Sequence, residues 1–246
     1  MWKIAGASIA GSSHTKNDTP CQDFIYSLTM EEATCIALAD GAGSCKYSDI
    51  GAKISCIAIT EHFTADFDRL FSLSTIEIQR YIIHFIRTRI GRKASMLETN
   101  KMELSSTLLF LAIKGDKFLL GHIGDGVICG ELNGKLVLLS APENGEFANT
   151  TYFVTSRNYK EHFRILRGNA SDYTSFFLMS DGAAEALFHK KEQFFSPALK
   201  TFSSWLDKYQ SNEVSAAIKS NMKNLFPKHT SDDCSIIIAH KSIEDI

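Results

Sequence analysis

Residues 104–139 read LSSTLLFLAIKGDKFLLGHIGDGVICGELNGKLVLL, and this stretch decides the class of fold. Its apolar runs are of strand length and lie at 104–113, 118–123, 127–132 and 135–139. The last two runs are joined by Asn133-Gly134, and Asn-Gly between apolar runs is the strongest short-range signal for a hairpin. Strands joined by such short loops pair in antiparallel fashion. The stretch therefore predicts an antiparallel meander and not a doubly wound parallel sheet.

Helical periodicity appears on both sides of this meander. Ile50, Ile54 and Ile57 share one face of a predicted helix. Ser74-Thr75-Ile76-Glu77 has the form of a capping box and starts a second helix, which we expect to end at Gly91. Two further helices are predicted after the meander, with apolar faces within 197–209 and 214–225.

The remaining apolar runs predict strands at 2–10, 24–28, 34–39, 173–179 and 235–239. Residues 157–167 carry several basic side chains and are expected to form a loop. The order of elements is thus strands, two helices, strands, two helices and a strand. Because no repeat or long linker divides the chain, we expect a single domain over residues 1–246.

Composition excludes several classes of protein. The chain has 246 residues, of which 44% are hydrophobic and 22% charged, which is ordinary for a soluble globular protein. A net charge of -2 argues against a general role at nucleic acids or membrane surfaces, both of which favour a basic excess. Six scattered cysteines without a Cys-x-x-Cys pair indicate neither a zinc site nor a disulfide framework. The N-terminus is too weakly apolar for a signal peptide, so we expect a cytoplasmic protein.

Four aspartates lie at the ends of predicted strands, namely Asp40, Asp125, Asp181 and Asp232. Each one alone also fits a tight turn or a helix cap, since Asp-Gly is a common turn and Ser-Asp a common cap. If the strands pack into one core, however, their ends bring these carboxylates together. Like charges at short range raise one another's pKa, and a divalent cation removes that conflict.

The kind of ligand indicates the kind of metal. Carboxylate, carbonyl and water oxygens suit Mg²⁺ or Mn²⁺, whereas zinc favours the nitrogen and sulfur ligands that are missing from this set. Two such ions about 4 Å apart can hold a water molecule whose lowered pKa makes it a nucleophile. That water is suited to in-line attack on phosphorus.

Six short motifs occur in an order that resembles a known family. They are Gln22-Asp23, Asp40-Gly41-Ala42-Gly43, Ser105-Ser106-Thr107, Gly124-Asp125-Gly126, Ser180-Asp181-Gly182 and Asp232-Asp233. The set resembles the metal-dependent protein serine/threonine phosphatases of type 2C, over about residues 5–240. It is most similar to a bacterial branch with Gly-x-Ser-His and Pro-Cys-Gln-Asp motifs. The matching segments here are Gly11-Ser12-Ser13-His14, Pro20-Cys21-Gln22-Asp23 and residues 144–149.

The resemblance implies an α+β fold, a four-layer α-β-β-α sandwich of two antiparallel sheets flanked by helix pairs. It also implies the metal ligands. Asp40 would bridge two Mn²⁺ or Mg²⁺ ions, the Gly41 carbonyl would bind one of them, and Asp181 and Asp232 would complete the site. Asp125 would serve a more weakly held third ion.

The resemblance further implies catalytic residues and partners. Asp23 would orient a metal-bound water, and the reaction would be hydrolysis of phosphoserine and phosphothreonine in proteins. A cognate serine/threonine kinase would supply the phosphorylated protein. Asp233, the second residue of the acidic pair, would be a surface group or one that touches no metal.

Two departures from the family pattern concern substrate binding and proton transfer. Ala42 stands where the family often places a histidine that protonates the leaving alcohol. The usual phosphate-binding arginine before Gln22-Asp23 is also absent, and His14 or Lys16 would contact phosphate from the same loop instead. These departures leave open an alternative function, a catalytically weak or silent phosphatase fold that acts as a binding or regulatory module.

Overall fold

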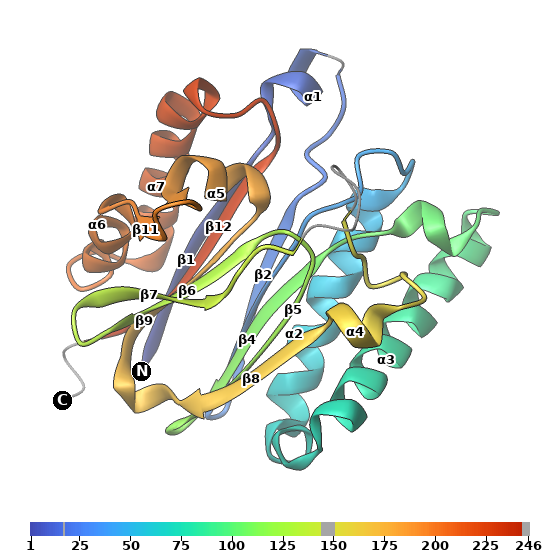
Figure 1. Cartoon of the computed structure of the whole chain (residues 1–246), viewed down its shortest axis with the longest axis horizontal. Coiled ribbons are helices and arrows are strands. Elements are labelled where there is room, and N and C mark those ends of the chain that lie inside the picture. The colour runs from blue at the N-terminus through green and yellow to red at the C-terminus, as the bar shows by residue number, and fades with distance from the viewer. Residues whose placement is uncertain (17, 144–150, 243–246) are drawn as a thin grey trace.

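Two five-stranded antiparallel sheets lie face to face at the centre of the protein (Figure 1). The computed structural model describes residues 1–16, 18–143 and 151–242. The first sheet has the strand order β1 (Trp2–Ile9), β12 (Cys234–Lys241), β9 (Tyr173–Met179), β6 (Val127–Leu132) and β7 (Lys135–Ser140). The second has the order β2 (Phe24–Met30), β3 (Ala33–Ala39), β4 (Leu108–Lys114), β5 (Lys117–Ile123) and β8 (Arg164–Asn169).

Helices cover the outer face of each sheet. On the second sheet lie α2 (Ser48–Ser72) and α3 (Thr75–Met96), and on the first lie α5 (Asp181–Leu187), α6 (Ala198–Trp205) and α7 (Ser211–Leu225). The shorter elements are α1 (Ser12–Lys16), α4 (Tyr159–His162), β10 (Phe188–His189), β11 (Phe194–Phe195) and the 3-10 turns Lys101–Leu104, Ala170–Asp172 and Phe226–Lys228. The predicted four-layer sandwich is confirmed. Within the described part of the chain, no helix is both long and apolar enough to cross a membrane.

Strand β3 shows why the sandwich forms. All seven of its residues are buried, because one face packs on helices and the other on the opposite sheet. Ile36 and Leu38 point into the layer between the sheets, where branched side chains interdigitate. Cys35, Ala37 and Ala39 point toward α2, and these small side chains let the helix approach closely. The strand is thus held on both faces up to the residue that precedes Asp40.

A predicted turn and a predicted helix start are both present in the structure. Asn133 and Gly134 both have positive φ, as the two-residue turn between β6 and β7 requires. Ser74 and Glu77 form the predicted capping box at the start of α3. Both predictions are confirmed.

Two other local predictions were wrong. Helix α3 continues past Gly91 to Met96; the space around Gly91 is open, and Ile90 and Ala94 on either side are buried. The predicted basic loop at 157–167 contains α4 and the start of β8, which pairs with β5 at the edge of the second sheet. Residues 144–149, which fit the bacterial branch in sequence, lie outside the described part of the chain.

Candidate metal centre

Asp40 leaves strand β3 into a loop that is fixed by hydrogen bonds to residues 105–107. The Asp40 N–H donates to Thr107 Oγ1 at 2.8 Å, and the Thr107 N–H donates to the Asp40 carbonyl at 2.8 Å. Further along this loop, the Ala42 N–H donates to the Ser105 carbonyl at 3.0 Å. The Ser105-Ser106-Thr107 motif therefore holds the loop that follows β3 through backbone and hydroxyl hydrogen bonds.

Gly41 lies where no side chain would fit. A Cβ atom at this position would lie 2.8 Å from the Ser48 carbonyl carbon and 2.9 Å from the Gln22 carbonyl oxygen. The Gly41 N–H donates to that same Gln22 carbonyl at 3.1 Å, and Gly41 bridges to Ser106. The absence of a side chain at Gly41 thus lets three segments pack against one another: the loop that follows β3, the start of α2, and Gln22-Asp23.

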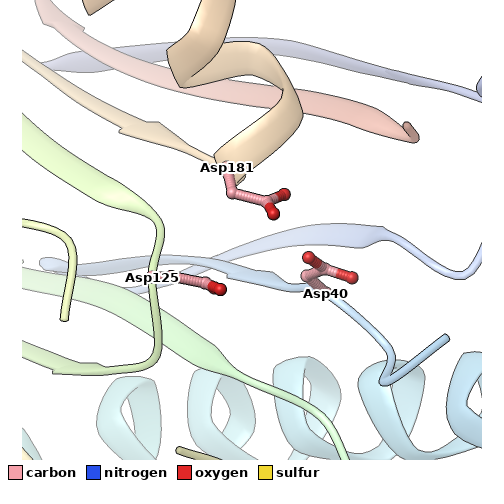
Figure 2. Close-up of side chains that lie close together, drawn as sticks. All are labelled: Asp40, Asp125 and Asp181. Carbon is pink, nitrogen blue, oxygen red and sulfur yellow. The ribbon is translucent and has the colours of Figure 1, made fainter. Parts of the chain in front are cut away.

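Three of the predicted carboxylates converge. Asp40 follows β3, Asp125 lies in the connection from β5 to β6, and Asp181 is the first residue of α5. One carboxylate oxygen from each lies within 4.8 Å of the other two, and Figure 2 shows the three side chains pointing toward a shared space. A set of three carboxylates at this spacing offers the hard oxygen ligands that Mg²⁺ and Mn²⁺ prefer.

The electrostatics of this cluster favour a bound cation. Burial, together with the charges of Asp125 and Asp232, raises the pKa of Asp181 to about 7. Burial and the neighbouring aspartates, Asp23 first among them, raise the pKa of Asp40 well above its usual range. Burial also raises the pKa of Asp125, although the hydroxyl of Thr151 partly offsets this effect. A divalent cation would offset the repulsion between these carboxylates, which contributes to the raised pKa values.

Asp23 is a buried carboxylate without an ordinary hydrogen bond among the described residues. It is 5% exposed, and neither of its oxygens has a partner within normal hydrogen-bond geometry. Burial raises its pKa to about 7, and the side chains of Ser235 and Ser180 partly offset this rise. Buried polar groups are rarely left unpaired. These orphaned oxygens fit the predicted role of holding a water molecule beside the metal.

Asp232 lies apart from the three converging carboxylates. It lines the same pocket, but its side chain is exposed and its Oδ1 accepts from the Asp233 N–H at 2.8 Å. Its charge still reaches the site, because it raises the pKa values of Asp40, Asp125 and Asp181. Asp232 is thus near the cluster without belonging to its innermost group.

Asp233 is the residue whose importance the sequence prediction missed. It is 3% exposed, which contradicts the first of its two predicted placements, at the surface; the second, a group that touches no metal, stays a prediction. Its carboxylate accepts from the backbone N–H groups of Gly11 and Gln22 and lies 2.9 Å from Nδ1 of His14. The one available signal was its position between Asp232 and a buried strand.

A pocket of about 440 Å³ joins these residues. Its lining is mainly small or acidic and comprises His14, Gln22, Asp40, Gly41, Ala42, Gly43, Ser44, Thr107, Asp125, Thr151, Phe153, Asp181, Asp232 and Asp233. Of the predicted site residues, Asp23 and Lys16 are absent from this lining, although the charge of Asp23 raises the pKa of Asp40. The geometry is that of an open pocket lined by several carboxylates.

Comparison with known proteins agrees with this geometry. The chain is 28% identical over 166 residues to serine/threonine-protein phosphatase 3 of Escherichia coli (strain K12), and the match covers 64% of each chain. The chain therefore matches less than two thirds of the length of that relative.

Solved structures are similar over nearly the whole chain. A bacterial serine phosphatase superposes with a TM-score of 0.66 at 11% identity, covering 98% of this chain and 99% of the other. The serine/threonine phosphatase Stp1 from Staphylococcus aureus gives 0.66 at 12% identity, with 98% and 96% covered. The catalytic domain of the serine threonine protein phosphatase PstP, in complex with two manganese ions, gives 0.65 at 16% identity, with 97% of each covered. At these identities the likeness establishes the fold.

The sequence itself carries the family assignment. Residues 10–223 match the family Protein phosphatase 2C, a span that includes every predicted site residue except Asp232. This agrees with the ordered motifs and with the convergence of Asp40, Asp125 and Asp181. The chain belongs to the protein phosphatase 2C family.

Proposed function

We propose that this protein is a Mn²⁺- or Mg²⁺-dependent phosphatase that hydrolyses phosphoserine and phosphothreonine in proteins. The observation that carries the proposal is the approach of Asp40, Asp125 and Asp181 to within 4.8 Å in an open pocket. These carboxylates would hold the metal ions, with the Gly41 carbonyl and Asp232 as the further ligands. When bound, the ions supply charge neutralisation and a water of lowered pKa.

The chain's own residues would then orient the reactants. Asp23, whose two oxygens have no hydrogen-bond partner among the described residues, would accept hydrogen bonds from the attacking water and fix its direction. His14 would contact the phosphoryl group, for which the chain lacks the family's usual arginine. Asp125 would bind the more weakly held third ion together with Asp181.

The test is metal-dependent hydrolysis of p-nitrophenyl phosphate and a phosphothreonine peptide. Asp40→Asn should abolish both reactions, because it removes the charge at the centre of the cluster. Asp116→Asn, at an exposed position in the turn between β4 and β5, is the matched control and should retain full activity. Full activity of Asp40→Asn, or activity of the wild-type protein in excess EDTA, would contradict the proposal.

A second candidate function is a catalytically silent phosphatase fold that binds a partner. Ala42 favours it, because a buried methyl group occupies the position of the family's proton donor. The acidic cluster argues against it, because a scaffold has no need to keep carboxylates whose burial is costly. Calorimetric titration with Mn²⁺ separates the two: the phosphatase requires binding, whereas absent binding would favour the scaffold.

We also propose the cellular setting. The whole chain would act as one phosphatase domain in the cytoplasm, on proteins phosphorylated by a cognate serine/threonine kinase. A net charge of -2 gives no attraction to nucleic acid or to an anionic membrane surface. Hydrolysis measured across a panel of phosphopeptides would define the substrate class. A preference for phosphotyrosine would contradict the proposed action on phosphoserine and phosphothreonine.

A further inference from the structure

Asp233 is a buried carboxylate to which the proposed metal site gives no task. Three groups converge on it: the Gly11 N–H donates to Oδ1 at 2.7 Å, the Gln22 N–H donates to Oδ2 at 2.6 Å, and His14 Nδ1 lies 2.9 Å from Oδ1. All three come from the N-terminal segment, which is 211–222 residues away in sequence. The residue that directly precedes β12 thus binds the N-terminal segment through its side chain.

The N-terminal segment packs closely against the residues that precede this carboxylate. A Cβ atom on Gly11 would lie 2.3 Å from the Ser231 carbonyl oxygen and 2.4 Å from the Asp232 carbonyl carbon, so only glycine fits there. The N–H and Oγ of Ser13 both donate to the Ser231 carbonyl, at 3.1 and 2.8 Å. The short turn that carries His14 is therefore packed directly against the residues that precede β12.

His14 lines the same pocket as the acidic cluster. Among the described residues that line the pocket, it is the only one whose side chain can carry a positive charge. Its side chain is 19% exposed, whereas that of Asp233 is 3% exposed. Since a carboxylate only accepts hydrogen bonds, its partner Nδ1 must carry a hydrogen. Nε2, on the other side of the ring, would donate a hydrogen bond to a phosphoryl oxygen when the ring is protonated, because both ring nitrogens then carry a hydrogen.

We propose that Asp233 is a positioning residue for phosphate recognition. It keeps the hydrogen on Nδ1 of the neutral ring and fixes the ring's orientation, so that Nε2–H of the protonated ring donates to the phosphoryl group of the substrate. This inference rests on the proposed phosphatase function and adds the means by which this chain compensates for the missing arginine. A carboxylate that fixes the tautomer and orientation of an imidazole is a widely used arrangement.

A double-mutant cycle tests this role through kcat and KM for the phosphothreonine peptide. His14→Asn keeps a donor near the Nδ1 position but removes Nε2, so kcat/KM should fall about 10- to 100-fold, mainly through KM. The Kd for Mn²⁺ should stay within about twofold, since His14 is no metal ligand. Asp233→Asn should cause a similar loss in the wild-type background but less than about a twofold loss in the His14→Asn background.

An equal loss from Asp233→Asn in both backgrounds would overturn the proposal, because Asp233 would then act only through Gly11 and Gln22. A loss of Mn²⁺ affinity in His14→Asn that matches the loss of kcat/KM would also overturn it. His189→Asn, at an exposed position on β10, is the matched control and should change neither quantity.

The tautomer of His14 gives a second measurement that needs no Asp233 variant. Long-range ¹H–¹⁵N spectra of the wild-type protein distinguish the two neutral tautomers, and the His14 signal is the one lost in His14→Asn. We expect the Nδ1–H tautomer, and an Nε2–H tautomer would overturn the proposal. If the wild-type protein hydrolyses neither substrate, the proposed function fails. The tautomer measurement still tests whether Asp233 accepts a hydrogen bond from His14 Nδ1.

Discussion

Holding Asp181 among other carboxylates should cost the metal-free protein a measurable part of its stability. Burial first, and then the charges of Asp125 and Asp232, raise its pKa from 3.8 to about 7. Between these values the folded state keeps a proton that the unfolded state has released, so the free energy of unfolding falls as pH rises. With about 1.4 kcal/mol for each pH unit, the cost is about 2 kcal/mol at pH 5 and about 4 kcal/mol at pH 8.

The substitution Asp181→Asn isolates this cost. It removes the charge, while Oδ1 can still accept the hydrogen bond that the Gly182 N–H donates at 2.6 Å. In EDTA, we expect the variant to exceed the wild type in free energy of unfolding by about 4 kcal/mol at pH 8 and by about 2 kcal/mol at pH 5. Urea denaturation followed by circular dichroism measures this, and the midpoint should rise by roughly 1.5 M at pH 8.

Two comparisons make this prediction specific. Asp116→Asn, which removes an exposed carboxylate, should change the free energy of unfolding by less than about 0.5 kcal/mol. Saturating Mn²⁺ should reverse the order, because the wild type gains binding energy that the variant has lost. A variant no more stable than the wild type at pH 8, or a gain equal at both pH values, would refute the reasoning.

Three further predictions concern the support of the site and the packing of the layers. Thr107→Val removes the acceptor of the Asp40 N–H and should lower the free energy of unfolding in EDTA by about 1–3 kcal/mol. Thr107→Ser keeps the hydroxyl and should retain most of the wild-type stability. Equal losses in the two variants would contradict the assigned hydrogen bond. Ser74→Ala breaks the capping box of α3 and should cost about 1 kcal/mol in urea denaturation, with an unchanged midpoint as the contrary result. Phe176→Ala empties a fully buried position between the sheets and should cost about 3–5 kcal/mol, and a loss below about 1 kcal/mol would show that the layer closes around the gap.

Elements set by local chemistry were predictable from the sequence. Asn133-Gly134 specifies a two-residue turn because both residues tolerate positive φ, and Ser74 with Glu77 satisfies the free N–H groups of a helix start. Asp40, Asp125 and Asp181 could be singled out because each carboxylate follows an apolar run. Their approach to one another followed only from the packing of the strands.

Features that depend on distant partners were not predictable. Gly91 looked like a helix end, but the burial of Ile90 and Ala94 outweighs the cost of about 1 kcal/mol for glycine within a helix. The burial of Asp233 could not be predicted because its donors, at Gly11 and Gln22, lie at the other end of the chain. Sequence spacing carries no information about such a contact until β1 and β12 are paired.

The origin of the three carboxylates makes metal affinity a late property of the folding chain. Asp40 extends from the second sheet, Asp181 from the first, and Asp125 from the connection that passes between them. A partly folded chain with only one sheet formed therefore has no three-carboxylate site, and metal ions would do little to stabilise it. Metal ions would thus bind the docked sandwich and favour it over intermediates with separated sheets. In cells, a larger supply of Mn²⁺ or Mg²⁺ would then lengthen the lifetime of this protein.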